Sequence, residues 1–366
     1  MATPTPVPPP TPPPLYRGKT LTELYTRKPP VWLIKYWAMR QTITLLTGKS
    51  GSFKTFIAID LAMRASTPPP TFTTFGPKGF IDRREATAFG GSIPVLYIMG
   101  ESQDSAAKRF KSWEQRYGIP EGTTPLIVHD NRVDLFTQGE MVKELVDFHD
   151  PDIVIFDTWS KNTPGMDENS KKEVDRAMNI AHEIKMGGDR GGRNVMFLHH
   201  PTKGDDDARG HSSMVNDSDI MIRAERLVTD DPSMPVWTKL ISKRQKEVED
   251  FYPYWVKLDR WHLRDSTGST IIDADGEPVT SLVVESFDEE PTRAATGAGP
   301  SITDQIFEYV QAHPGAKATE IQMAIWGKKG SNVYERMDQL KTQGKITGNK
   351  DGYEVVVPVL DPMEDL

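Results

Sequence analysis

Short, fully apolar runs alternate with helical patterns through most of the first 200 residues. The runs that we expect to form buried strands are Thr42–Leu46, Val95–Met99, Leu126–Val128, Ile153–Phe156 and Val195–Leu198. Apolar residues recur at helical spacing in the segments Phe53–Ala65, Ser105–Tyr117, Gln138–Phe148 and Asn169–Lys185. Continuous apolar strands that alternate with helices are typical of a parallel sheet covered on both faces. The pattern therefore predicts an α/β domain.

The pattern changes after Met221. Five strand-like segments follow, joined by turns such as Asp275-Gly276: Trp237–Ser242, Tyr254–Leu258, Trp261–Arg264, Thr270–Ile272 and Leu282–Val284. These segments predict an antiparallel extension of the same sheet. Earlier in the chain, the Pro- and Gly-rich stretch Ser66–Ser92 interrupts the alternation, and we interpret it as a surface insertion.

Both ends of the chain differ from the main domain, which we place at residues 29–287. The first 14 residues contain eight prolines, so we expect residues 1–28 to be a disordered or polyproline arm. Residues 288–300 are a linker and residues 358–366 an acidic tail. Between them, residues 301–357 predict three helices (Ile302–Ala312, Thr319–Trp326, Ser331–Gln343) and a hairpin of Lys345–Thr347 with Tyr353–Val357. This order is typical of a winged helix.

The composition limits the kinds of protein that this chain can be. It has 366 residues, of which 37% are hydrophobic and 26% charged, with no cysteine, no membrane-length apolar run and no secretory signal pattern. We therefore expect a cytoplasmic protein. The net charge is −8, whereas proteins that coat DNA phosphates are usually basic. Any DNA contact must then be local, in a groove, a loop or the inner surface of a ring.

A phosphate-binding loop is predicted where the strand Thr42–Leu46 leads into a helix. The loop is Gly48-Lys49-Ser50-Gly51-Ser52-Phe53-Lys54-Thr55. Its backbone amides would face the phosphates of ATP, Lys54 would reach the β- and γ-phosphates, and the Thr55 hydroxyl would bind Mg²⁺. One position departs from the usual pattern, because Phe53 stands where a glycine is normal. We expect a phenylalanine here to require a negative φ.

Polar residues end three of the predicted strands, at the edge where ligands bind in parallel sheets. Asp157 follows Ile153–Phe156 and is the expected Mg²⁺ carboxylate. Glu101 follows Val95–Met99 and is a candidate base for the attacking water, with a helix-capping or surface role as the alternative. His199 and His200 follow Val195–Leu198; one is a candidate γ-phosphate sensor, and a plain polar strand end is the alternative. A metal site at this pair would need a third ligand that the spacing does not supply.

The motifs together resemble the RepA-type branch of the RecA-like ATPases, which includes plasmid hexameric helicases and many phage-borne ATPases. The matching stretches, within about residues 30–260, are WLIKYWAMRQTITLLTGKSGSFKTFIAIDLA, VLYIMGE, PDIVIFDTWSKNTPGMDENS, VMFLHHPTKGDDDARGHSSMVNDSD and ISKRQKEVEDF. The GSFKT form of the loop looks like a variant found among the phage members. The resemblance implies a RecA-like core that works as a ring of six copies, with ATP at each subunit boundary, in a bacterial host cytoplasm.

The resemblance also implies roles for individual residues. Glu101 would be the catalytic base and His199 the sensor. Arg209-Gly210, with Ser212 and Ser213, matches a loop that faces the central channel. Arg244 and Lys246 are similar to a basic pair that reaches into the neighbouring subunit's ATP site; a solvated charge run is the competing interpretation. Arg109 is a candidate for stacking on adenine.

The predicted function is ATP hydrolysis coupled to DNA, as a replicative helicase or helicase loader of a phage or plasmid with single-stranded DNA in the ring. A recombination or annealing ATPase and a nucleotide-switched regulator remain open. Seven basic and seven acidic residues balance in 301–357, but Lys328–Lys329 and Lys341–Lys350 concentrate positive charge. This unit is expected to contact duplex DNA or to dock a replication protein such as an initiator or primase.

Overall fold

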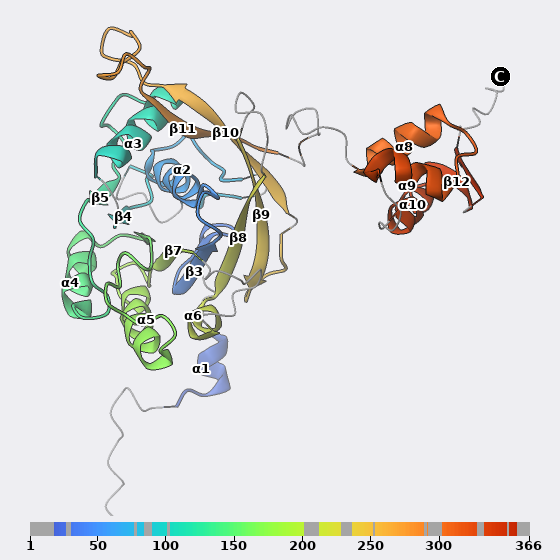
Figure 1. Ribbon diagram of the computed structural model, residues 1–366. Helices are drawn as coiled ribbons and strands as arrows, with labels where there is room; N and C mark the ends of the chain where they lie inside the picture. Colours follow the sequence, from blue (N-terminus) through green and yellow to red (C-terminus); the bar gives the residue numbers. More distant parts are fainter. Residues whose placement is uncertain are drawn as a thin grey trace, which may run out of the picture.

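A nine-stranded mixed sheet is the main feature of the described residues in this computed structural model (Figure 1). The structure describes residues 18–26, 31–76, 79–83, 90–100, 103–200, 212–227, 236–251, 253–288, 291, 302–327, 333–349 and 351–356. Across the sheet the strands follow the order β11-β10-β9-β8-β3-β7-β6-β4-β5. Their bounds are β3 (Thr42–Thr47), β4 (Val95–Met99), β5 (Ile127–His129), β6 (Ile153–Asp157), β7 (Asn194–His199), β8 (Ile220–Leu227), β9 (Val236–Gln245), β10 (Tyr254–His262) and β11 (Thr280–Asp288).

The strands from β8 to β5 run parallel to one another, which confirms the predicted parallel sheet. β3 lies between β8 and β7, and β6 lies on the far side of β7. Because all these strands point the same way, the segments that follow β3, β7, β6 and β4 leave the sheet at one edge. That edge holds the candidate site.

Helices cover both faces of the parallel strands. α2 (Lys54–Ser66) and α3 (Gln103–Tyr117) pack on one face. α4 (Gly139–His149), α5 (Lys171–Met186) and α6 (Ser212–Asp217) pack on the other. Side chains alternate between the two cores along each strand, so that Ile155 faces α2 while its neighbour Phe156 faces α5. No described helix is long and apolar enough to cross a membrane.

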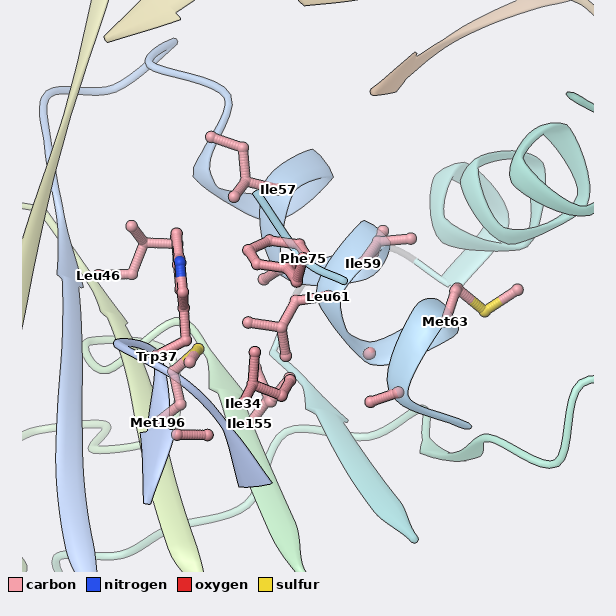
Figure 2. Close-up of a cluster of buried hydrophobic side chains, with 14 of the residues drawn as sticks. Ile34, Trp37, Leu46, Ile57, Ile59, Leu61, Met63, Phe75, Ile155 and Met196 are labelled. Atoms are coloured by element: carbon pink, nitrogen blue, oxygen red, sulfur yellow. The ribbon is translucent and has the colours of Figure 1, made fainter. Parts of the chain in front are cut away.

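The core on the α2 face combines segments that are far apart in sequence. Figure 2 shows side chains of β3, β6, β7 and α2 meeting Ile34 and Trp37. Ile34 ends β1 (Trp32–Ile34), which forms a small hairpin with β2 (Ala38–Met39), and Trp37 lies in the turn between them. The apolar pattern does not predict this hairpin, because its strands are too short to show a period.

The stretch Ser66–Ser92 is not the simple surface insertion that the sequence suggests. Phe75 is fully buried, and its ring meets the Trp37 ring edge-on with the centroids 4.8 Å apart. The Phe72 ring packs against Trp113 of α3, with the ring centroids 5.3 Å apart. The Pro- and Gly-rich composition reflects the turns of this stretch, whereas Phe72 and Phe75 pack into the core on the α2 face of the sheet.

The antiparallel extension is confirmed with changed boundaries. β9, β10 and β11 pair antiparallel in sequence order, and β8 joins them to the parallel strands. The segments predicted separately at Tyr254–Leu258 and Trp261–Arg264 are one strand, β10. The segment Thr270–Ile272 makes only isolated bridges. β8 itself is missed by the sequence analysis, because Arg223, Glu225 and Arg226 interrupt its apolar pattern.

Residues 302–356 contain the predicted three helices and hairpin: α8 (Ile302–Ala312), α9 (Ala318–Trp326), α10 (Val333–Thr342), β12 (Ile346–Asn349) and β13 (Gly352–Val355). They enclose a core of their own around Ile306, Ile321, Met337 and Tyr353. The expected N-cap Ser331 and the pair Lys328–Lys329 lie outside the described residues. Of the arm predicted at residues 1–28, residues 1–17 and 27–28 also lie outside them, whereas Leu21–Tyr25 form the short helix α1 rather than a disordered or polyproline segment.

The burial of Phe75 generates a stability prediction. Replacing Phe75 with Ala should destabilise the protein by about 3–5 kcal/mol, because the substitution opens a cavity against Trp37. Phe80, in the same stretch, is 51% exposed, so Phe80→Ala is a matched control that should change stability by less than about 0.5 kcal/mol. Scanning calorimetry of the full chain measures both. Equal behaviour of the two variants would show that the stretch does not belong to the core.

Candidate nucleotide-binding site

The loop between β3 and α2 has a backbone that only glycine adopts easily at two positions. Gly48 has φ +153° and Gly51 has φ +78°. A Cβ atom on Gly48 would lie 2.3 Å from the Ala224 carbonyl oxygen of β8, so the loop passes too close to β8 for any side chain there. Gly48, Lys49, Ser50, Gly51 and Ser52 thus form a tight turn at the carboxyl edge of the sheet, followed directly by the N-terminus of α2.

Lys54 lies inside this loop. Its side chain is buried, and its ammonium group donates hydrogen bonds to the carbonyl oxygens of Gly48 (2.7 Å) and Lys49 (3.1 Å). Ser52 Oγ lies 3.4 Å away. The ammonium group is therefore positioned at the mouth of a ring of backbone amides, where it can exchange carbonyl oxygens for phosphate oxygens.

Phe53 contradicts the expectation of a negative φ. It has φ +62° and ψ +22°, the left-handed conformation, and it precedes α2 as its N-cap residue. This conformation costs an L-residue roughly 1–2 kcal/mol. The ring packs against Phe56 with the centroids 6.2 Å apart, and the Arg226 guanidinium lies 5.0 Å from its centroid. We infer that these contacts offset the strain, since a cation over an aromatic ring is worth about 0.5–1 kcal/mol at an exposed site.

Asp157 lies across from α2 at the end of β6. The Thr55 hydroxyl donates to one of its carboxylate oxygens at 3.3 Å, and the Tyr97 hydroxyl of β4 donates to the other at 2.8 Å. Asp157 as a whole is 7% exposed. Thr55, Tyr97 and Asp157 also line one small cavity. Lys54 is the residue before Thr55, so the loop and Asp157 meet at the carboxyl edge of the sheet, as the loop-and-carboxylate hypothesis requires.

The same geometry suits a hard divalent cation. The hydroxyl of Thr55 and the carboxylate of Asp157 are oxygen donors at the mouth of the loop, and Mg²⁺ prefers one or two such ligands together with phosphates and water. Tyr97 supports this arrangement. Burial raises the pKa of Tyr97 well above its usual value, and the adjacent Asp157 charge raises it further, so the hydroxyl stays protonated and can donate.

A family model described as an AAA domain matches residues 15–206, which is more than half of the chain. The chain belongs to the AAA-domain family. The match spans the loop at Gly48–Thr55 and Asp157, and an AAA domain implies nucleotide binding. A search of curated proteins found no match to this chain. The strands β8 to β11 and residues 302–356 lie outside the matched range.

Arg109 lies at the edge of the AAA-domain site. Its guanidinium is 4.9 Å from the Phe56 ring centroid, and it lines the cavity that contains Thr55 and Asp157. Arg109, the candidate for stacking on adenine, thus lies over an aromatic ring of the protein, that of Phe56. Glu101 lies outside the described residues. Gly100, just before it, donates its amide to the Asp157 carbonyl at 2.7 Å, which fixes the tip of β4 beside β6.

The two histidines that follow the β7 apolar run occupy different places. His199 is the last residue of β7, pairs with Thr47 and is buried. His200 Nδ1 lies 3.2 Å from the Lys54 ammonium nitrogen. The family resemblance assigns the sensor role to His199, whereas the geometry brings His200 to the loop lysine. No cluster of three potential metal ligands occurs among the described residues.

Arg244 and Lys246 do not approach the chain's own loop. Arg244 donates to the Val215 carbonyl at 2.7 Å, and Lys246 pairs with Asp219 at 2.7 Å. Gln245 between them is opposite Ile220, which pairs with Thr44, so the pair lies toward the amino ends of the parallel strands. Burial acts to raise the pKa of Asp219, but Lys246, the Ile43 amide and Lys185 outweigh it, and the pKa is lowered. The loop around Arg209-Gly210 lies outside the described residues, and Ser212 and Ser213 begin α6.

Tyr97 and Arg226 are the functional candidates that sequence reasoning missed. Tyr97 lies within an apolar run of five buried strand residues. Its hydroxyl is the one polar side-chain group of that run, and it is the only sequence signal for a role in the site. Arg226 is a single charge on β8, and nothing in its local sequence connects it to a loop more than 170 residues earlier.

Phe53 yields a test of the left-handed loop. Phe53→Gly should retain ATP binding, because glycine adopts this φ without strain. Phe53→Ile should weaken ATP binding by roughly tenfold, since a β-branched residue is disfavoured there by 1–2 kcal/mol or more. Fluorescent-ATP titration gives both affinities. Tighter binding by the Ile variant than by the Gly variant would contradict the left-handed assignment.

Tyr97 yields a second test. Tyr97→Phe removes one hydrogen bond to a carboxylate, which is worth about 1.5–3 kcal/mol, and should raise the Mg²⁺ concentration for half-maximal ATP hydrolysis by roughly tenfold. Tyr117→Phe is the control, because its hydroxyl donates to the Val284 carbonyl away from the site. Unchanged Mg²⁺ dependence in Tyr97→Phe would remove Tyr97 from the site.

Proposed function

We propose that this AAA-domain ATPase is a RecA-like ring motor that acts on DNA, of the replicative-helicase type carried by phages and plasmids. The observation that carries the proposal is the separation of the cationic groups. Lys54, Thr55 and Asp157 lie at the carboxyl ends of the parallel strands, whereas Arg244 and Lys246 lie toward the amino ends. A cation that stabilises the γ-phosphate from this position has to serve the site of a neighbouring copy.

The proposed reaction is hydrolysis of ATP to ADP and phosphate. Water attacks the γ-phosphorus while the bond to the β–γ bridging oxygen breaks. Glu101 accepts the proton of the water, and Lys54 neutralises charge on the phosphates. Asp157 and Thr55 would hold Mg²⁺, which would neutralise further charge on the phosphates when bound. His200, through its contact with Lys54, is the better placed of the two histidines to register loss of the γ-phosphate.

The link to DNA rests on the family resemblance and on residues 302–356. Three helices followed by a hairpin is the order of a winged helix, in which the third helix enters a DNA groove. In α10, Tyr334 is 51% exposed and Arg336 is also exposed, while Lys341 lies over the Tyr353 ring. Acidic residues alternate with these along the helix, so a protein partner such as an initiator or primase remains the second candidate for this unit.

Two other functions make different demands. A recombination or annealing ATPase would bind ATP and single-stranded DNA without separating strands. A nucleotide-switched regulator would ignore generic single strands and retain one duplex sequence through residues 302–356. Both alternative functions use the same nucleotide site as the motor and differ from it in the DNA process that nucleotide binding or hydrolysis controls.

The deciding experiment measures ATP hydrolysis with and without single-stranded DNA, followed by separation of a forked duplex. A motor should hydrolyse ATP several-fold faster with single-stranded DNA and should release the displaced strand. Lys54→Ala should lower hydrolysis by roughly 100-fold or more, because it removes a preorganised charge at the phosphates. Hydrolysis that is indifferent to single strands, with no strand release, would reject the motor; hydrolysis that survives Lys54→Ala would reject the catalytic assignment.

A further inference from the structure

Arg244 and Lys246 make different kinds of contact, although one residue separates them in the chain. Arg244 is half-buried and donates to the Val215 carbonyl of α6 at 2.7 Å. Lys246 follows the end of β9, and its side chain, which is 37% exposed, reaches the Asp219 carboxylate at 2.7 Å. The planar guanidinium is held in one geometry by its contact with α6, whereas an ammonium group on a flexible stem can change partners. Lys246 is therefore the member of the pair that can reach another molecule.

Asp219 keeps other donors when Lys246 leaves it. One carboxylate oxygen accepts from Lys246. The other accepts from the Ile43 amide at 2.9 Å and from the Lys185 ammonium group at 3.3 Å. Because the Lys185 side chain is only 13% exposed, this second lysine stays beside Asp219 and compensates its charge. An ion pair as exposed as that of Lys246 contributes little to stability, so Lys246 can exchange Asp219 for another anion at small cost.

The backbone around Lys246 is anchored, although its side chain is exposed. The Lys246 amide donates to the Asp219 carbonyl at 3.2 Å. The side chain of Gln245, the preceding residue, donates to the Tyr36 carbonyl at 3.0 Å. The four-carbon stem of Lys246 can thus turn about a fixed point at the amino ends of the parallel strands. In a ring built from head-to-tail contacts, this end of one copy can face the carboxyl edge of the next copy.

We propose that Asp219 is the resting partner of Lys246, and that Lys246 leaves it for the γ-phosphate of ATP bound by the adjacent copy. Arg244 keeps its contact with Val215 and anchors α6. The inference rests on the proposed ring, and it narrows the contact between copies to one ammonium group. Two anions, a carboxylate in the same copy and a phosphate in the next, compete for this cation. Asp219 therefore restrains hydrolysis until both copies and ATP are in place.

Turnover of variant chains tests the competition. Lys246→Ala should lower kcat by roughly 100-fold or more and leave the KM for ATP unchanged, because a cation supplied by a neighbour acts on the transition state. Asp219→Asn keeps an oxygen for the Ile43 amide but lacks the charge that holds Lys246. This variant should raise kcat about two- to fivefold, the size of effect that an exposed ion pair can have. In the Lys246→Ala background, Asp219→Asn should leave kcat unchanged, because the restrained cation is absent.

Amine labelling of the wild-type chain tests the exchange without any substitution. The chain is treated with an acetylating reagent, with and without a non-hydrolysable ATP analogue, and each lysine is quantified by mass spectrometry. Lys246 should be acetylated severalfold more slowly in the oligomer with the analogue, because its amine then contacts phosphate at a subunit boundary. Lys143 is the matched control, since its side chain is 33% exposed and pairs with Asp147 at 2.7 Å. Its labelling should not change.

The outcomes separate this inference from the proposed function. A kcat in Lys246→Ala equal to that of the wild type rejects the contact between copies, and the inference with it. A low kcat in Lys246→Ala, together with a folded Asp219→Asn chain that gains no turnover, overturns the exchange and leaves the contact standing. If Asp219→Asn does not fold, the labelling decides: Lys246 acetylation that the analogue does not slow overturns the exchange. A wild type that stays monomeric with ATP and DNA rejects the ring itself.

Discussion

The carboxylate of Asp157 is the point on which the rest of the site depends. It is buried at the end of β6 and accepts one hydrogen bond from Thr55 of α2 and another from Tyr97 of β4. A buried carboxylate is costly unless its charge is compensated, and the hydroxyls of Thr55 and Tyr97 contribute to that compensation. A divalent cation held by Asp157 and Thr55 would contribute further. The Asp157 carboxylate thus links α2 to β4 and favours a positively charged ligand beside it.

Phe53 shows how a loop can keep its shape after losing its usual residue. The turn requires a left-handed backbone, which a glycine adopts without strain. In Phe53 the contacts of the ring with Phe56 and Arg226 offset the energy that this conformation costs. The Arg109 guanidinium lies 4.9 Å from the Phe56 ring centroid. The start of α2 therefore has two arginines over its aromatic rings, next to the candidate phosphate-binding loop.

The fold was largely readable from the sequence, because buried parallel strands leave uninterrupted apolar runs that few other structures produce. The loop and Asp157 were readable for a related reason: each follows such a run, and the sheet brings its strand tips together. Three features escaped. The left-handed φ at Phe53 is set by the turn, and the Arg226 contact that helps to offset its strain comes from a residue distant in sequence. The burial of Phe72 and Phe75 was hidden by the prolines and glycines around them. The choice between His199 and His200 turns on side-chain direction at a strand end, which alternates with every residue.

The position of β7 has a consequence for how the enzyme changes state. β7 is hydrogen-bonded to β3 on one side and to β6 on the other along almost its whole length. The loop strand and the carboxylate strand are therefore held at a fixed spacing by the ladder between them. Differences between ATP and ADP forms must then arise in side-chain rotations at the strand tips and in the segments beyond them. The sheet supplies a common frame of reference against which structures of successive nucleotide states can be superimposed.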